Sequence, residues 1–181
     1  LGLKYEKVEN PDQRAAQSIL QDKVIGWMNG AAEFGPRALG NRSILASAFN
    51  PEMKKIINEK IKFREGFRPF CPSVLEDDFE KAFASPKQDL PYMTINVDVN
   101  SENYPSITHV DKTARVQTVG DDSPFSNILK KIQSEKGTGI AVNTSFNRRG
   151  EPMVYSPRDA VSCFFGSGLD HLFINDFLIS K

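Results

Sequence analysis

The chain has 181 residues, of which 39% are hydrophobic and 25% charged, a composition typical of a folded domain with its own core. Its 23 basic and 23 acidic side chains cancel, so no net field attracts nucleic acid or an anionic membrane, and any basic site has to be local. No apolar run approaches the roughly 20 residues of a membrane span, and no signal peptide is visible. We therefore expect a single cytoplasmic domain over residues 1–181, with neither a membrane nor nucleic acid as its partner.

The four potential metal ligands Cys71, Cys163, His109 and His171 show no metal-type spacing, so no protein metal site is expected. We expect the two cysteines to be reduced and mostly buried. The chain opens at Leu1 rather than at a Met, which we interpret as a fragment or a trimmed form of a longer protein.

Four helix starts share one pattern, in which a capping side chain precedes a proline at the first helical position. They are Asn10-Pro11, Asn50-Pro51, Ser123-Pro124 and Ser156-Pro157. The third helix is expected to end at Gly137.

Short apolar runs between these helices predict strands. They cover residues 24–28, 44–49, 93–99, 115–119 and 139–143, and residues 172–174 and 177–179 flank a turn at Asn175-Asp176. Residues 100–112 are expected to form a loop. Hairpins combined with helical crossovers predict an α/β fold with a mixed sheet.

The nine arginines are concentrated where Gly, Pro or Asn indicates that the backbone turns. A guanidinium is a rigid planar fork that matches phosphate and carboxylate oxygens, which lysine does not. The distribution therefore favours oxyanion recognition, and pairing with acidic neighbours at the surface is an equal alternative from the distribution alone.

Two of the arginine-bearing blocks lie in the first half of the chain. Residues 33–43 form a loop shaped by Gly and Pro that carries Arg37 and Arg42, with a purely structural turn as the alternative. Residues 62–73 carry Lys62, Arg64 and Arg68 among three phenylalanines. If this segment is extended, alternation places the cations on related faces, and we expect the Phe and Pro residues, not the charges, to supply its packing.

Two further blocks follow. Residues 109–119 contain Arg115, and residues 143–152 contain Ser145 and Asn147, whose hydroxyl and amide suit a small polar ligand or a phosphate. Turn chemistry alone is the alternative for the last block. The chain contains no P-loop, no dinucleotide fingerprint and no nucleophile elbow.

Together these blocks resemble the C-terminal domain of the NodU/CmcH-type O-carbamoyltransferases. The similarity extends from about Asp12 to Ile179. It is carried by four motifs in order, Gly-Pro-Arg-Ala-Leu-Gly-Asn-Arg-Ser at 35–43, Lys-Phe-Arg-Glu with Phe-Arg-Pro-Phe at 62–70, Thr-Ala-Arg-Val-Gln at 113–117 and Asn-Thr-Ser-Phe-Asn at 143–147.

The resemblance implies a YrdC-like fold, a twisted mixed sheet with flanking helices around a basic concavity. It implies that this domain uses ATP, as its Mg²⁺ complex, and carbamoyl phosphate to make carbamoyl adenylate. A Kae-like N-terminal domain of the parent chain, with a bound metal, then passes the carbamoyl group to a hydroxyl acceptor. The resemblance therefore implies this N-terminal domain as a partner of the chain, together with carbamoyl phosphate and ATP.

Carried over by position, the resemblance assigns catalytic roles to Arg37, Lys62 and Arg68. It assigns substrate binding to these three and to Arg115 and Ser145. Arg42, Arg64 and Asn147, which lie in the same blocks, are further candidates for substrate binding. Two alternatives stay open: a threonylcarbamoyl-adenylate synthase, which would need threonine, and an RNA-binding YrdC-like module, against which the zero net charge counts.

Overall fold

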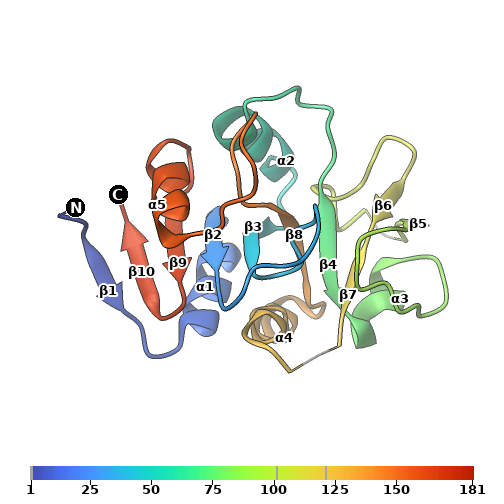
Figure 1. Ribbon diagram of the computed structural model, residues 1–181. Coiled ribbons are helices and arrows are strands. Elements are labelled where there is room, and N and C mark those ends of the chain that lie inside the picture. Colours follow the sequence, from blue (N-terminus) through green and yellow to red (C-terminus); the bar gives the residue numbers. More distant parts are fainter. Residues whose placement is uncertain (1, 101, 121) are drawn as a thin grey trace.

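The computed structural model describes residues 2–100, 102–120 and 122–181. Its centre is a twisted eight-stranded sheet in the order β1-β10-β9-β2-β3-β8-β4-β7 (Figure 1). Neighbouring strands run antiparallel except for two parallel pairs, β2 with β9 and β4 with β7. The strands are β1 Tyr5–Lys7, β2 Ile25–Met28, β3 Arg42–Ser47, β4 Cys71–Leu75, β7 Gln117–Val119, β8 Ile140–Ser145, β9 His171–Ile174 and β10 Phe177–Ser180.

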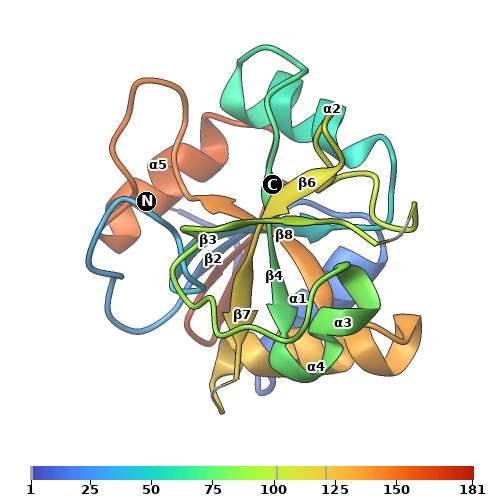
Figure 2. The same cartoon turned by 90° about the vertical axis from the view of Figure 1, so that its right-hand side faces the viewer.

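A small two-stranded sheet of β5 (Asn96–Asp98) and β6 (Thr113–Arg115) lies beyond the β4–β7 edge, where the twist of the large sheet is plain (Figure 2). The helices are α1 Pro11–Leu20, α2 Met53–Ile57, α3 Phe79–Ala82, α4 Pro124–Lys136 and α5 Pro157–Phe165, with a π-helical turn η1 Asn58–Lys62 and a 3-10 turn η2 Glu76–Asp78. This arrangement confirms the expected α/β fold with a mixed sheet. No helix in the described ranges is long and apolar enough to cross a membrane.

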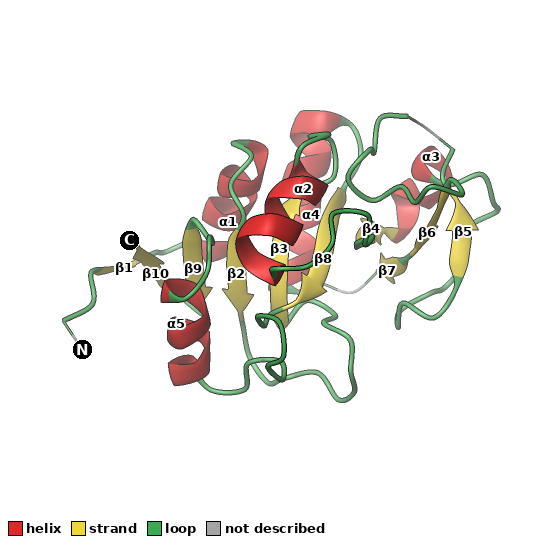
Figure 3. Ribbon diagram, turned by 90° about the horizontal axis from the view of Figure 1, so that it is seen from above, coloured by secondary structure: helices red, strands yellow, loops and turns green. Residues whose placement is uncertain are grey.

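Alternate positions along the central strands fill two hydrophobic layers, one on each face of the sheet. Ile25 and Trp27 of β2 join the layer under α1 and α4, whereas Met28 of β2 and Val24, which directly precedes the strand, join the layer under α2 and α5. Figure 3 shows α1 and α5 on opposite sides of β9 and β2. Because both faces are covered, β2 and β3 are buried at every position and β8 is buried over residues 140–143, although β3 and β8 also carry polar side chains.

Three of the four predicted helix starts are confirmed, since α1, α4 and α5 all begin at the proline of the motif. The N-cap hydroxyls of Ser123 and Ser156 accept the backbone N–H groups of Ser126 and Asp159, completing capping boxes. Helix α4 ends at Gly137, which has a φ of 80°. The remaining helix start, predicted at Asn50-Pro51, lies later than expected, at Met53, because residues 51 and 52 form a turn.

The prediction of one strand over 115–119 was wrong, because the chain leaves the small sheet after Arg115 and enters the large sheet at Gln117. The run 93–99 is a strand only over Asn96–Asp98, and Met93 has a φ of 54°. Residues 100–112 lack helix and strand, as expected, apart from Ser101, which lies outside the described residues.

Residues 62–73 are extended only at their end, where Cys71–Ser73 belong to β4. Lys62 ends η1, and Phe63 follows with a φ of 46°, which turns the chain out of the helix into a loop. Phe63 and Phe67 are exposed, and of the three phenylalanines only Phe70 is buried. The expectation that the Phe and Pro residues, not the charges, supply the packing holds for Phe70 but not for Phe63 and Phe67, and Lys62 is itself buried.

Candidate functional site

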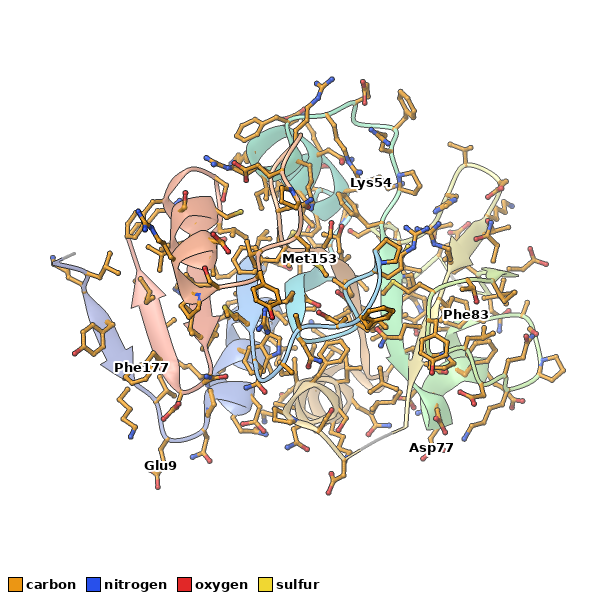
Figure 4. The ribbon with its side chains drawn as sticks, in the orientation of Figure 1. Glu9, Lys54, Asp77, Phe83, Met153 and Phe177 are labelled. Atoms are coloured by element: carbon orange, nitrogen blue, oxygen red, sulfur yellow. The ribbon has the colours of Figure 1, made fainter. Side chains whose placement is uncertain are left out.

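A basic pocket lies where β8 ends and β4 begins, beside β6. Asn143 of β8 pairs with Cys71 of β4 in an antiparallel register, so the end of one strand and the start of the other share an edge. The pocket has a volume of about 150 Å³, and its wall includes residues 36–38, 69–71 and 143–145. Figure 4 shows side-chain nitrogen atoms gathered between β4 and β6.

Three arginines line this pocket, Arg37, Arg64 and Arg115, and within the described ranges no carboxylate lines it. Arg37 is exposed and its side chain makes no hydrogen bond or ion pair among the described residues. Arg115 donates from Nη2 to Cys71 Sγ at 3.3 Å, and its Nε is buried without a partner. Uncompensated guanidinium groups around a small cavity favour an anion as its occupant.

Arg64 is held more firmly than the other two arginines. Its Nε donates to Asn58 Oδ1 at 2.7 Å, and its guanidinium lies over the Phe70 ring at 4.8 Å from the centroid. Burial lowers the pKa of Arg64, the nearby Arg68 lowers it further, and Glu65 opposes the shift. A bound anion would relieve this like-charge repulsion.

The loop that carries Arg37 is organised by one carboxylate at its start. Glu33 Oε1 accepts three backbone N–H groups, from Leu39 at 2.7 Å, Asn41 at 2.7 Å and Arg42 at 3.0 Å. An irregular loop cannot satisfy these donors with regular backbone pairing, so the side chain replaces it. The loop is therefore preorganised before any ligand binds.

A row of polar side chains on the sheet holds the carbonyl groups of the same loop. Asn143 Nδ2 donates to Ala38 O at 3.2 Å, and Gln117 Nε2 donates to Leu39 O at 3.0 Å. Ser73 connects the two amides, since its Oγ donates to Gln117 Oε1 at 2.6 Å and accepts from Asn143 Nδ2 at 2.9 Å. Three strands, β4, β7 and β8, thereby fix the loop beside the pocket.

Lys62 lies next to the pocket with Ser145 and Asn147, which are distant from it in sequence. Its Nζ donates to Ser145 O at 2.5 Å and to Asn147 Oδ1 at 2.8 Å, and it lies 3.1 Å from Asn147 O and 3.3 Å from Ser145 Oγ. The side chain is only 5% exposed. Burial and, to a smaller extent, the nearby Arg64 lower the pKa of Lys62 to about 7, and Cys163 opposes the shift.

These contacts show how the predicted site residues are related. Lys62 does not line the pocket, but it holds Ser145, which does. Because Ser145 Oγ also donates to Asn147 Oδ1 at 2.8 Å, the three side chains form one hydrogen-bonded group. Direct contact of Lys62 with a phosphate stays a prediction.

Four predicted site residues lie outside the lining of the pocket: Lys62 and Asn147, described above, and Arg42 and Arg68. Arg42 is 4% exposed at the start of β3, and its two Nη groups donate to the carbonyls of Asn29, Gly30 and Asn41. Burial lowers the pKa of Arg42, and the Glu33 carboxylate opposes the shift. Arg68 is exposed, with its Nη1 3.8 Å from Glu65 Oε2. Ligand contacts of Arg42 and Arg68 stay predictions.

A second cavity of about 470 Å³ adjoins the basic pocket and shares Arg37, Met93 and Arg115 with it. Its further lining includes two aromatic rings, Phe34 and Tyr92, that are both exposed. The two cavities together combine guanidinium groups with open aromatic surface.

Several residues that shape this site were not predicted from the sequence. Glu33, Ser73, Gln117 and Asn143 were assigned no role, although a buried amide or hydroxyl inside an apolar strand indicates an internal polar network. No local pattern indicates Tyr92, because it reaches the site through a loop from a distant part of the chain.

Comparison with known protein families gives the decisive observation. The family described as carbamoyltransferase C-terminus matches residues 16–181. This chain belongs to the carbamoyltransferase C-terminus family. Nodulation protein NolNO of Sinorhizobium fredii is 42% identical over 186 residues, which cover 99% of this chain and 27% of that protein. Nodulation protein U of Rhizobium tropici is 40% identical over 171 residues, which cover 92% of this chain and 29% of that protein. The resemblance to NodU-type proteins is therefore confirmed.

Two solved structures resemble the fold of this carbamoyltransferase C-terminal chain. Full-length HypF in a phosphate- and nucleotide-bound form matches 99% of this chain and 22% of its own, with a TM-score of 0.64 and 16% identity. P. abyssi Sua5 complexed with L-threonine matches 91% of this chain and 46% of its own, with a TM-score of 0.66 and 17% identity. These likenesses confirm the YrdC-like fold. The chain spans between 27% and 36% of the length of the curated relatives it matches.

Proposed function

We propose that this chain binds carbamoyl phosphate and ATP, as its Mg²⁺ complex, and joins them into carbamoyl adenylate. The observation that carries the proposal is the pocket into which Arg37, Arg64 and Arg115 converge without a carboxylate. Carbamoyl phosphate and ATP are both polyanions, and bringing them together requires cations that offset their repulsion. Membership of the carbamoyltransferase C-terminus family supports carbamoyl chemistry rather than other anion chemistry.

The proposed reaction has two steps. In the first step water attacks the phosphorus of carbamoyl phosphate and the bond from that phosphorus to the carbamoyl oxygen breaks, which leaves carbamate, inorganic phosphate and a proton. A carbamate oxygen then attacks the α-phosphorus of ATP, the bond from that phosphorus to the bridging oxygen breaks, and pyrophosphate leaves. Charge grows on the phosphoryl oxygens and on the leaving group, which fixed guanidinium donors stabilise without rearranging.

The geometry suggests how the residues divide this work. The small pocket, lined by Arg64 and Ser145, suits carbamoyl phosphate, and the adjoining larger cavity, with its exposed Phe34 and Tyr92 rings, suits the nucleotide. Arg37 and Arg115 line both cavities, so they would bridge the two reacting anions. Transfer of the carbamoyl group to a hydroxyl is proposed for the part of a full-length protein that this chain does not include.

Ligand binding tests the proposal directly. A ligand at a hundredfold excess over its dissociation constant stabilises the native state by about 2.7 kcal/mol, so carbamoyl phosphate and ATP with Mg²⁺ should each raise the melting temperature. We expect Arg37→Met to weaken binding at least tenfold, which is about 1.4 kcal/mol. Arg14→Met, an exposed arginine on α1, is the matched control and should bind as the wild type does.

The absence of both heat and thermal shift with millimolar concentrations of either ligand would refute the proposal. A parallel assay with threonine and bicarbonate tests the alternative substrate. If pyrophosphate release from ATP depended on threonine and bicarbonate rather than on carbamoyl phosphate, the chain would form a different adenylate on the same fold.

A further inference from the structure

One face of the sheet is left without a covering helix at the end opposite the basic pocket. Tyr5 of β1 lies directly opposite Ile179 of β10, and Phe177 lies opposite Ile174 of β9, so these four side chains share one face. Figure 4 places Phe177 at this outer end of the sheet. Tyr5 is 67% exposed and Phe177 is 39% exposed, which is unusual for large apolar groups on a sheet face.

The opposite face of the same strands is covered. Leu178 and Phe173, which alternate with the exposed residues, are buried in the layer under α1. On the uncovered face, α5 reaches only as far as β9 and leaves a groove of about 650 Å³ between Val161, Phe177 and the first strand. In a layered fold both faces of a sheet are normally covered, so the sheet face at this groove lacks a covering element.

Among the residues that the structure describes, one charged residue lines the groove. Arg158, in the first turn of α5, makes no side-chain hydrogen bond or ion pair within the described ranges. An apolar surface with a single unpaired guanidinium best fits a partner that presents apolar side chains and a carboxylate.

The length of the relatives indicates which partner this is. The chain corresponds to between 27% and 36% of each curated relative, and its family is described as a C-terminus, so the relatives carry a much longer stretch that has no counterpart here. Leu3 and Tyr5, at the start of the chain, form one wall of the groove. Polypeptide that precedes them would emerge beside it (Figure 1).

We propose that this groove is the surface on which the preceding part of a full-length protein docks, through apolar side chains and a carboxylate that faces Arg158. The proposal does not depend on the ligands suggested for the basic pocket, which is lined by other residues.

Amide hydrogen exchange tests the proposal by comparing the 181-residue chain with the full-length product of the same gene. We expect residues 3–7 and 177–180 to exchange at least tenfold more slowly in the full-length protein. Phe177→Glu should abolish this protection, because it places a charge in the apolar contact. Val110→Glu, at an exposed apolar residue outside the groove, is the matched control and should leave the protection unchanged.

Three outcomes would overturn the proposal. The gene could encode no preceding domain, the two forms could exchange at equal rates, or the 181-residue chain could form a dimer in light scattering that Phe177→Glu dissociates. The last outcome would assign the groove to a second copy. In each case the thermal shift with carbamoyl phosphate should be the same in Phe177→Glu as in the wild type, so the failure is separate from that of the proposed function.

Discussion

The amine of Lys62 is buried among oxygen atoms of Ser145 and Asn147, and burial lowers its pKa to about 7. An anion bound beside Ser145 favours the protonated amine. We therefore expect carbamoyl phosphate binding at pH 8 to take up a proton. Calorimetry in two buffers with different ionisation enthalpies measures this uptake, and Lys62→Met should remove it. Equal binding heats in the two buffers for the wild type would contradict the assignment.

The same lowered pKa affects folding stability. Between pH 7 and the ordinary lysine value of 10.5, the unfolded chain holds a proton on Lys62 that the folded chain has released. Stability increases with pH wherever the unfolded state binds more protons. The free energy of unfolding of the wild type, relative to that of Lys62→Met, should therefore rise across this window in urea titrations. A constant or falling difference would show that Lys62 stays charged in the fold.

Glu33 has a structural role that can be measured separately from binding. Hydrogen bonds to a charged acceptor contribute about 1.5–3 kcal/mol each and are not additive, so we expect Glu33→Ala to lower the free energy of unfolding by about 2–4 kcal/mol. Glu33→Gln keeps an acceptor oxygen and should cost less. Glu9→Ala, at an exposed glutamate, is the control, with an expected change below about 0.5 kcal/mol. A loss of unfolding free energy in Glu33→Ala no larger than that of the control would show that the Glu33 carboxylate does not stabilise the loop.

At the scale of elements, two glycines in the loop 33–42 allow backbone strain and side-chain packing to be tested separately. Gly35 has a φ of 118° and Gly40 a φ of 112°, a region that other residues rarely adopt. A Cβ on Gly35 would meet nothing within 4 Å, whereas one on Gly40 would lie 2.2 Å from Phe125 of α4.

Both alanine substitutions carry the strain, but only Gly40→Ala also overpacks the contact with α4. We expect Gly40→Ala to cost about 1–3 kcal/mol more than Gly35→Ala in the free energy of unfolding. Gly40 packs against Phe125 and its carbonyl accepts the indole N–H of Trp27, so it fixes the end of the loop that carries Arg37. Gly40→Ala should therefore also weaken carbamoyl phosphate binding, measured by calorimetry. Equal costs for the two variants would show that α4 does not support the loop.

At the scale of the whole molecule, the proposed function predicts that the chain forms carbamoyl adenylate but does not transfer the carbamoyl group. The 181-residue chain should release pyrophosphate from ATP only when carbamoyl phosphate is present. Without the rest of a full-length protein, carbamoyl adenylate should hydrolyse to AMP instead of reaching a hydroxyl acceptor. A coupled pyrophosphate assay, with mass spectrometry of added sugars, measures both. Carbamoylated sugar formed by this chain alone would place the transfer site here.

The starts of three helices could be predicted from the sequence alone. Proline at the first helical position marked the starts of α1, α4 and α5, because its fixed φ is a local property, and the N-cap hydroxyls of Ser123 and Ser156 add a second local signal for α4 and α5. The motifs around Arg37, Arg115 and Ser145 also placed these residues in one family pattern, which the family match confirms.

Only the tertiary structure decided how the parts of the site are joined. Lys62 contacts residues 83 and 85 positions away, and Gln117 holds a carbonyl 78 positions away. The division of residues 115–119 between two sheets depends on partner strands elsewhere in the chain. Such features follow from which strands pair, and pairing is driven by the burial of apolar faces over the whole molecule, which no local pattern contains.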